Sequence, residues 1–297
     1  MAVPDWPSTY GYNLFLYPWQ TWLSGPWDLF IEHGHRLLGA LVGMLTIAAA
    51  VCIWRYDDRR WLKVLSVVAI LAVIAQGVLG GLRVLLDART LAMIHGCTGP
   101  AFFGFAIALS AFTSRWWRTN ESRRDILSAA ALQRLAVLTA GMAYCQLVLG
   151  ARVRHIALGS TPDSFQAAVI LHLGMAILLA LHVAWLAIEV WQHHRGTKAW
   201  GPANLLAVLV VLQIALGIMT WVAKYGWPAW LVRQGWGAAH VVSAGSIYQA
   251  SIVTAHVAVG SLIFATSLLL ALRSLRLFRD EPVEASIHFR SFLGVAA

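Results

Sequence analysis

The chain has 297 residues, of which 59% are hydrophobic and only 12% are charged. In soluble domains about a quarter of the residues are charged, so this composition excludes an ordinary soluble protein. The formal net charge of +9 would suit a nucleic-acid-binding protein, but the basic residues lie in short segments between long apolar runs and form no continuous stripe. We therefore expect the chain to meet a lipid membrane and no nucleic acid.

Seven apolar runs are long enough to cross a membrane as α-helices, which takes roughly 20 residues each. Lipid offers no hydrogen-bond partners to the backbone, so open strands are excluded there. The sequence predicts an all-α integral membrane protein with about seven transmembrane helices. The runs cover residues 36–54, 64–86, 92–114, 131–152, 167–191, 204–223 and 249–272.

The basic residues between these runs are divided unevenly between two sides. If successive loops alternate across the membrane, one side collects 15 of the 22 Lys and Arg residues and the other side 7. Cytoplasmic loops carry the excess of basic residues, so we assign the richer side to the cytoplasm of a bacterium or its mitochondrial equivalent. The poorer, outer side holds Arg36, Arg83, Arg89, Arg152, Arg154, Lys224 and Arg233.

The segment before the first run contains the sequence Pro4-Asp5-Trp6-Pro7, which is typical of an external loop. Glu32 precedes His35 by three residues, so both side chains are expected on one helical face. A carboxylate beside His35 could take part in chemistry. The alternative is a structural ion pair between Glu32 and Arg36, which are four residues apart.

The motif Gln-x-x-Leu-Gly occurs in three of the runs, at residues 76–80, 146–150 and 213–217. Small residues let transmembrane helices approach closely, so helix packing is one explanation of the glycines. The glutamines are harder to explain in this way, because an amide inside a span needs a polar partner. We interpret the three copies as an internal repeat.

Four histidines lie near the outer ends of their runs: His35, His95, His172 and His256. A small residue follows each one four positions later, on the same helical face. Such a residue would leave room for a flat macrocycle. Two neutral imidazoles can hold both axial positions of a haem iron inside a helical bundle. A lone histidine of this kind would more often bond a neighbouring loop, but four at one depth favour two haem-binding pairs.

The pairs fall one in each half of the chain, His35 with His95 and His172 with His256. We predict two pseudo-symmetric bundles of a four-helix type: an N-terminal half over residues 1–125, and a C-terminal half with a cytoplasmic tail over residues 126–297. The run with Gln146 has no counterpart in the first half, so the first bundle is expected to be one helix short. Both halves would enter the membrane in the same sense, as in a parallel duplication.

Polar side chains on the outer side could complete both sites. Guanidinium groups form forked hydrogen bonds with carboxylates such as haem propionates. Simple anchoring at the membrane interface is the alternative for any one arginine. The candidate cofactor-binding residues are Arg36, Gln76 and Arg83 in the first half and Arg152 and Arg154 in the second.

These motifs resemble those of the haem A synthase family, and the resemblance covers nearly the whole chain. It rests on Pro4-Asp5-Trp6-Pro7, Glu32-x-x-His35-Arg36-Leu37-Leu38-Gly39, Gln76-x-x-Leu79-Gly80 with Arg83-Val84, and then His95, His172 and His256. The family has eight transmembrane helices, so the resemblance implies that the first of them is missing from this chain.

The resemblance implies an oxidoreductase that oxidises a methyl group of haem O to the formyl group of haem A, for cytochrome oxidase. It implies that His35 and His95 hold the substrate haem O, that His172 and His256 ligate a haem b iron, and that Glu32 is the catalytic carboxylate. The expected partners are the haem O synthase, an electron acceptor or donor and, in a possible homo-oligomer, further copies of the chain. The alternative is a di-haem b-type electron-transfer subunit, which needs no Glu32. A colourless transporter built from repeats is a third interpretation.

Overall fold

A computed structural model describes residues 3–119, 126–157, 159–237 and 239–277. These residues form ten helices and no β-strand, apart from a single bridge between Thr9 and Tyr12. The helices are α1 (Trp19–Ser24), α2 (Trp27–Tyr56), α3 (Arg60–Leu85), α4 (Arg89–Thr113), α5 (Arg115–Thr119), α6 (Ile126–Arg154), α7 (Pro162–His193), α8 (Trp200–Tyr225), α9 (Ala229–Val232) and α10 (Ile247–Leu277).

The predicted fold class is confirmed, since seven of these helices are long and apolar enough to cross a membrane. Five of them contain a predicted run completely, and α3 and α4 end one residue before their runs do; several helices begin well before their runs at the outer end. Helix α2 begins at Trp27, directly after Pro26, and α7 begins at Pro162, where Thr161 Oγ1 accepts a hydrogen bond from the Ser164 N–H. Proline suits the start of a helix, and a count of apolar residues misses such polar first turns.

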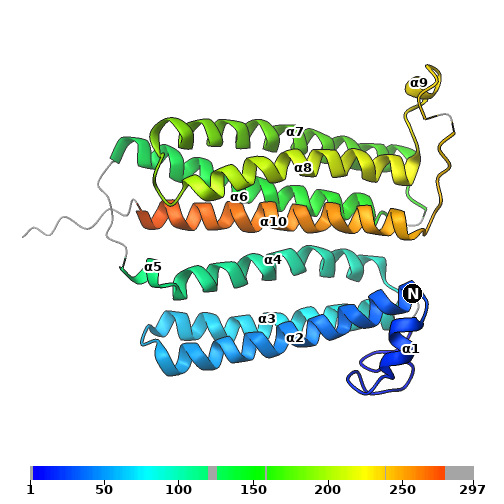
Figure 1. Cartoon of the computed structure of the whole chain (residues 1–297), viewed down its shortest axis with the longest axis horizontal. Helices are drawn as coiled ribbons and strands as arrows, with labels where there is room; N and C mark the ends of the chain where they lie inside the picture. The colour runs from blue at the N-terminus through cyan, green and yellow to red at the C-terminus, as the bar shows by residue number, and fades with distance from the viewer. Residues whose placement is uncertain (1–2, 120–125, 158, 238, 278–297) are drawn as a thin grey trace, which may run out of the picture.

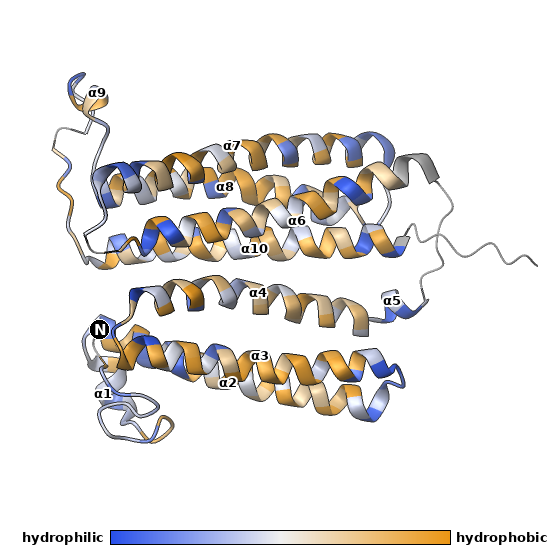
Figure 2. Cartoon of the chain, turned by 180° about the vertical axis from the view of Figure 1, so that it is seen from behind, coloured by the Kyte–Doolittle hydropathy of each residue, from blue (hydrophilic) through white to orange (hydrophobic). Residues whose placement is uncertain are grey.

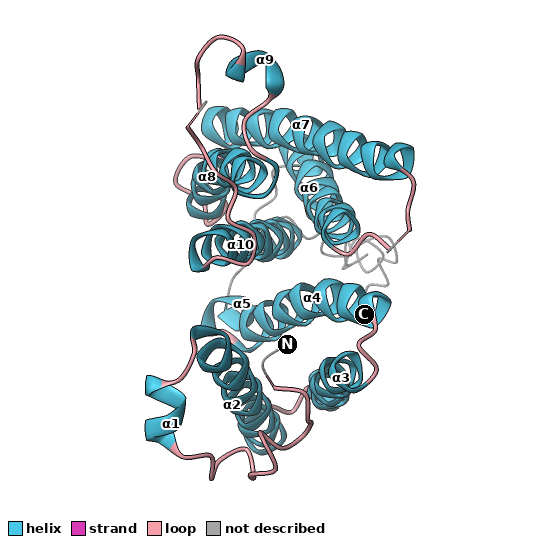
Figure 3. Cartoon of the chain, turned by 90° about the vertical axis from the view of Figure 1, so that its right-hand side faces the viewer, coloured by secondary structure: helices cyan, strands magenta, loops and turns pink. Residues whose placement is uncertain are grey.

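The long helices lie side by side in two groups (Figures 1 and 3). The first group contains α2, α3 and α4, and the second contains α6, α7, α8 and α10. Helix α4 joins the groups by packing against α10 and α6. Gly104 permits this close approach, because a Cβ atom there would lie 2.5 Å from the ring of Phe264 on α10.

Burial differs between the two groups. The main buried cluster lies entirely within the second group, with Leu132, Leu186, Leu206 and Leu270 fully enclosed. In the first group the described residues contain no fourth long helix, and fewer of its side chains are buried. The second group therefore has a closed four-helix core, and the first group is more open.

The outer surface of both groups is apolar over the middle of the helices. Leu38, Leu71 and Leu181 are 62%, 61% and 65% exposed, which would be unfavourable in water and is expected against lipid. Figure 2 shows hydrophobic residues along the helix centres and hydrophilic residues gathered mainly at the ends. The chain is an integral membrane protein.

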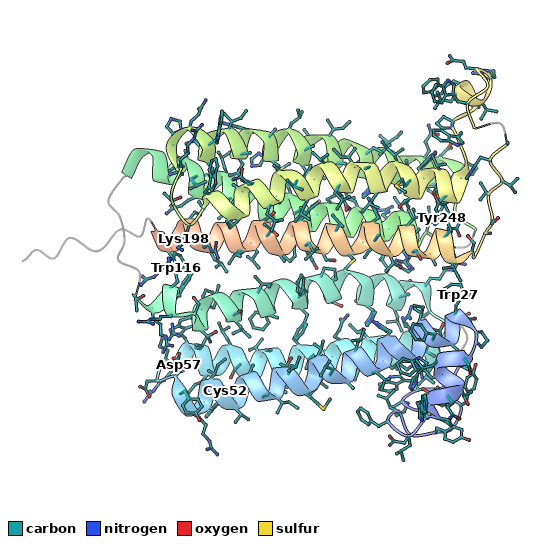
Figure 4. The ribbon with its side chains drawn as sticks, in the orientation of Figure 1. Trp27, Cys52, Asp57, Trp116, Lys198 and Tyr248 are labelled. Atoms are coloured by element: carbon teal, nitrogen blue, oxygen red, sulfur yellow. The ribbon has the colours of Figure 1, made fainter. Side chains whose placement is uncertain are left out.

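The helices alternate in direction, so that the two ends of the molecule carry different loops. Trp27 and Tyr248 lie at one end, and Asp57, Trp116 and Lys198 lie at the other (Figure 4). We call these the outer and inner ends. Of the basic residues assigned above to the cytoplasm, Arg123, Arg124, Arg279 and Arg290 lie outside the described residues, as does the predicted tail.

At the inner end, Arg59 connects the turn between α2 and α3 to α4. It forms an ion pair of 2.7 Å with Asp57 and also donates a hydrogen bond to the carbonyl oxygen of Phe112. The hydrogen bond from Arg59 holds the pKa of Asp57 at about 2. This turn therefore keeps its charges paired at neutral pH.

Candidate haem-binding sites

The first histidine pair is formed by His35 on α2 and His95 on α4. Their ring centres are 6.1 Å apart and their planes are nearly perpendicular, at 87°. The second pair is formed by His172 on α7 and His256 on α10, with ring centres 6.4 Å apart and planes at 75°. Each predicted pair is thus brought together across its own helix group.

All four histidines lie at a similar depth from the outer end. Each follows the first residue of its helix by six to ten positions, and these four helices all begin at the same end of the molecule (Figure 1). The four imidazoles form two separate pairs, one per group. The histidines therefore make two sites at one level.

The spacing within each pair matches the requirement for binding one metal ion on opposite faces of a flat ring. Two metal–nitrogen bonds of about 2.0 Å in line, with each nitrogen about 1.1 Å from its ring centre, would separate the ring centres by roughly 6.2 Å. The observed values of 6.1 and 6.4 Å lie on either side of this distance. Among the described residues, no three His, Cys, Asp or Glu side chains converge on a metal site, so neither pair is part of a larger cluster of such side chains.

Gln76, a candidate from the sequence, lies on α3 against the first pair. Its side-chain amide donates to the carbonyl oxygen of His95 at 2.9 Å and accepts from Thr98 Oγ1 at 2.6 Å. Its backbone carbonyl accepts a hydrogen bond of 3.2 Å from Nδ1 of His95. That bond places the proton on Nδ1 and leaves Nε2 available as a metal ligand.

The corresponding glutamines of the second group point at the Nε2 atoms of His172 and His256. Nε2 of Gln146 lies 3.4 Å from Nε2 of His172, and Nε2 of Gln213 lies 3.5 Å from Nε2 of His256. The Oε1 atoms of both glutamines are buried and have no hydrogen-bond partner among the described residues. These long contacts place both amides beside the Nε2 atoms of His172 and His256.

The small residues that follow the histidines differ in their surroundings. A Cβ atom at Gly99 or Gly260 would lie 3.1 Å from the side-chain amide of Gln76 or Gln213, respectively, whereas a Cβ atom at Gly39 would meet nothing within 4 Å. Two of these glycines therefore leave room for glutamine side chains. The space that we expected for a macrocycle remains beside Gly39.

Glu32 lies one helical turn before His35 and is held by the N-terminal segment. Its Oε2 accepts a hydrogen bond of 2.9 Å from the backbone N–H of Val3. Arg36 donates to the carbonyl oxygens of Val3 at 3.0 Å, Asp5 at 2.8 Å and Ser8. The segment that begins at Val3 is therefore fixed to the outer end of α2, next to the first pair.

Other contacts of this N-terminal segment could not be anticipated from the sequence. His33, which is only 2% exposed, lies 3.0 Å from Thr9 Oγ1 through its Nδ1 atom, and its ring packs against Tyr17. The indole of Trp6 covers Gly81 on α3, where a Cβ atom would lie 2.3 Å from the ring. The segment thus contacts both α2 and α3 at the outer end.

Asp5 organises the turn of this segment. Burial raises the pKa of Asp5, but hydrogen bonds from the Gly11 N–H, the Ser8 hydroxyl and the Tyr10 N–H outweigh burial and bring the pKa to about 2. The carboxylate is therefore charged under any physiological condition. It stabilises the turn by accepting these hydrogen bonds.

Basic side chains gather between the two groups at the outer end, and we call Arg83, Arg89, Arg154, His155 and Lys224 the outer basic cluster. Arg83 acts electrostatically on the first pair and also on Arg154, which in turn acts on Lys224. Burial lowers the pKa of His155, and so do the charges of the four other members.

Arg89 also connects the two helix groups directly, because its side chain donates a hydrogen bond to the carbonyl oxygen of Ile156 at 3.3 Å. Arg152, also a candidate, is exposed two residues before Arg154.

The cluster lies just outside the level of the histidines. Arg83 follows Gly80 by three residues on α3, Arg154 follows Gly150 by four on α6, and each of these glycines lies against a histidine ring. The concentration of positive charge favours anionic groups at this level. Lys224 and His155 were not among the sequence candidates, because their proximity depends on how α6 and α8 pack.

Comparison with known proteins gives consistent matches. The family model COX15-CtaA, described as cytochrome oxidase assembly protein, matches residues 27–167, which run from α2 into the start of α7. A heme A synthase of Shouchella clausii is 29% identical over 234 residues, covering 72% of this chain and 74% of the relative.

Two further relatives are also heme A synthases. That of Symbiobacterium thermophilum is 26% identical, covering 65% of this chain and 70% of the relative, and that of Halalkalibacterium halodurans is 27% identical, covering 64% and 69%. No solved structure matches the chain. The matches confirm the resemblance inferred from the motifs: the chain is similar to the COX15-CtaA family of cytochrome oxidase assembly proteins and to the heme A synthases.

Proposed function

We propose that this protein is a haem A synthase, an oxidoreductase that oxidises a methyl group of haem O to the formyl group of haem A for cytochrome oxidase. The observation that carries the proposal is the spacing of the two histidine pairs, 6.1 and 6.4 Å between ring centres, which suits a haem iron between each pair. The match to the COX15-CtaA family model and the similarity to heme A synthases support the same activity.

We assign a different task to each half. In the half formed by residues 1–125, His35 and His95 would hold haem O. In the half formed by residues 126–297, His172 and His256 would ligate a haem b iron. The assignment is supported by the position of Glu32, since the residues three positions before His95, His172 and His256 are apolar: Ala92, Val169 and Val253.

Glu32 would be the catalytic carboxylate. When bound, the haem irons supply the oxidation chemistry. Glu32 lies one turn outside His35, and the Val3 N–H holds its carboxylate in place. A negative charge there would stabilise positive charge that develops as the methyl group is oxidised, or would orient a water molecule.

The outer basic cluster would bind the propionates. Arg83 serves the first site and Arg154 the second, with Arg152 beside it. Arg36 already donates to three backbone carbonyl groups, so its main contribution would be to hold the N-terminal segment, with a propionate as a further acceptor. Gln76 would act through its contacts with His95.

We place the outer end, with both sites, on the non-cytoplasmic side of the bacterial plasma membrane or its mitochondrial equivalent. The basis is the excess of basic residues in the inner loops. Conversion of a methyl to a formyl group with oxygen from water releases four electrons and four protons, and an electron acceptor must take up the electrons. With oxygen from dioxygen, successive oxygenation of the methyl group needs an electron donor instead. A haem O synthase would supply the substrate, and a homo-oligomer is compatible with the exposed apolar helix faces.

The test is a reduced-minus-oxidised spectrum of the purified membrane protein, followed by haem extraction. A haem A synthase yields haem b together with haem O or formyl-bearing haem A. The variant Glu32→Gln should keep its haem b and bind haem O while forming at least roughly 100-fold less haem A, which is typical of losing one electrostatic group. The matched control is Asp28→Asn, one turn earlier on α2.

Two results would overturn the proposal. A di-haem electron-transfer subunit would yield only haem b and would tolerate Glu32→Gln. A transporter would be purified without colour.

A further inference from the structure

We propose that Gln-x-x-Leu-Gly is a histidine-seating motif, in which the glutamine carbonyl and the glycine of one helix together position the ligand histidine of the next long helix. The inference rests on the proposed function, because it assumes that these histidines bind haem iron. It assigns a positioning role to Gly80, Gly150 and Gly217, which would otherwise be explained by helix packing alone.

The positions of the motif glycines provide the first observation. A Cβ atom at Gly80 would lie 2.9 Å from Cε1 of His95, one at Gly150 would lie 3.0 Å from Cε1 of His172, and one at Gly217 would lie 3.2 Å from Cε1 of His256. Cε1 is the ring atom between the two nitrogens. In all three copies, therefore, the motif glycine lies against the same edge of the imidazole.

The pairing between motif and histidine is also regular along the chain. The motif on α3 contacts the histidine of α4, the motif on α6 that of α7, and the motif on α8 that of α10. Helix packing by small residues would place the glycines against any neighbouring side chain. Contact with the same atom of three ligand histidines requires a more specific explanation.

The backbone carbonyl of the motif glutamine provides the second observation. In the first group, the Gln76 carbonyl accepts the Nδ1 proton of His95 at 3.2 Å. In the second group, the carbonyls of Gln146 and Gln213 also approach the rings of His172 and His256, but in a looser geometry that leaves both Nδ1 atoms without a hydrogen bond among the described residues. The hydrogen bond to the carbonyl is thus formed in the first group, and the contact with the glycine is the feature that all three copies share.

This arrangement has a direct consequence for a ligand histidine. A hydrogen bond from Nδ1 to a carbonyl oxygen fixes the tautomer and the ring orientation, and it makes Nε2 a more basic ligand. The glycine allows the ring to come close enough to the carbonyl of the residue one turn earlier. A methyl group at the glycine would push the imidazole away from the carbonyl and would turn Nε2 off the iron axis.

The test replaces each motif glycine by alanine and compares it with a glycine on the same helix whose Cβ atom would meet nothing within 4 Å. The pairs are Gly80→Ala with Gly77→Ala on α3, Gly150→Ala with Gly141→Ala on α6, and Gly217→Ala with Gly201→Ala on α8. Haem retention per protein, the low-spin ferric signal in electron paramagnetic resonance and the midpoint potential are measured for each purified holoprotein.

We expect Gly150→Ala and Gly217→Ala to weaken haem b retention by roughly tenfold or more, with the larger effect at Gly150, as for overpacking of a tight contact. Haem that stays bound should show an altered low-spin signal and a higher midpoint potential, because the ligand is less basic. The Gly141→Ala and Gly201→Ala controls should match the unsubstituted protein. Gly80→Ala should act on haem O binding and leave haem b unchanged.

Equal haem retention, signal and potential in Gly150→Ala and Gly141→Ala would overturn the motif's role while leaving the proposed function intact. Absence of haem from the unsubstituted protein would instead overturn the proposed function. If Gly150→Ala does not fold, the double variant Gly150→Ala with His172→Ala decides the matter. It should regain the thermal stability of His172→Ala if the methyl group clashes with the imidazole, and its failure to do so would contradict the inference.

Discussion

The two halves contain the same histidine geometry in different surroundings. The second half encloses His172 and His256 within four long helices and a continuous buried cluster. The first half holds His35 and His95 among three described long helices, and an N-terminal segment is fastened across its outer end by Glu32 and Arg36. A closed bundle suits a haem that stays bound, whereas an open bundle with a separate cover suits one that is exchanged.

The glutamines show the same difference at atomic scale. Thr98 accompanies Gln76 in the first half and donates to its amide oxygen, whereas the residues three positions after His172 and His256 are Met175 and Val259. The amides of Gln146 and Gln213 instead point toward the Nε2 atoms of His172 and His256. The two histidine pairs are therefore similar in spacing and differ in the side chains that surround them.

We expect the strongest change in haem content when one histidine of each pair is removed. His172→Ala should lower the haem b content at least tenfold, because one axial ligand is lost, while His35→Ala should change it less than twofold and stop formation of haem A. Haem extraction from both purified variants measures this. His193→Ala, at the inner end of the same helix as His172, is the control. Equal loss of haem b in His35→Ala and His172→Ala would abolish the distinction between the halves.

The next effect concerns the rate of haem release. In the described part of the chain, the glycines of the three motifs lie against His95, His172 and His256. None of the three motifs therefore positions His35. We expect haem to leave the first half at least roughly tenfold faster than the second. Transfer to excess apomyoglobin would be followed with His172→Ala, which keeps only the first site, and with His35→Ala, which keeps only the second. Similar rates in the two variants would contradict the proposed division of tasks.

A smaller effect is expected when the N-terminal segment is loosened. Arg36→Ala removes three hydrogen bonds from a charged donor, which should make local opening of residues 3–12 easier by about 2 kcal/mol, or roughly 30-fold. Hydrogen exchange of this segment, read by mass spectrometry, measures the opening. Arg233→Ala, also at the outer end, should leave the exchange unchanged. A segment that stays fully protected in Arg36→Ala would show that Trp6 and Thr9 suffice to hold it.

The smallest effect should appear only in acid. The pKa of Asp5 is about 2, below its ordinary value of 3.8, because of its hydrogen bonds to Gly11, Ser8 and Tyr10. A lowered pKa contributes stability that is complete above pH 3.8 and is lost as the pH falls toward 2. Protection of the segment, relative to the intrinsic exchange rate at each pH, should therefore fall between about pH 4 and pH 2. Asp5→Asn should remove this pH dependence of the protection, and an unchanged profile would exclude Asp5 as its source.

The seven long helices, the four histidines and the resemblance to the heme A synthases all follow from the sequence alone. Lipid offers the backbone no hydrogen-bond partners, so local hydropathy is sufficient to find the seven spans. The three copies of Gln-x-x-Leu-Gly, the first of them at Gln76 to Gly80, indicate the repeat. The sequence also separates Glu32 from the apolar residues at the corresponding positions of the other helices. These features depend on residues that are close together in the chain.

The contacts between side chains of different helices can be seen only in the tertiary structure. The contact of each motif glycine with Cε1 of a histidine, the burial of His33 beneath the N-terminal segment and the gathering of Arg83, Arg154 and Lys224 all join helices that are separate in the sequence. Hydropathy is nearly uniform around most of these helices, because lipid and helix interior are both apolar, so no local pattern indicates which face meets which neighbour. Packing selects the faces, and with them the partners of each polar side chain.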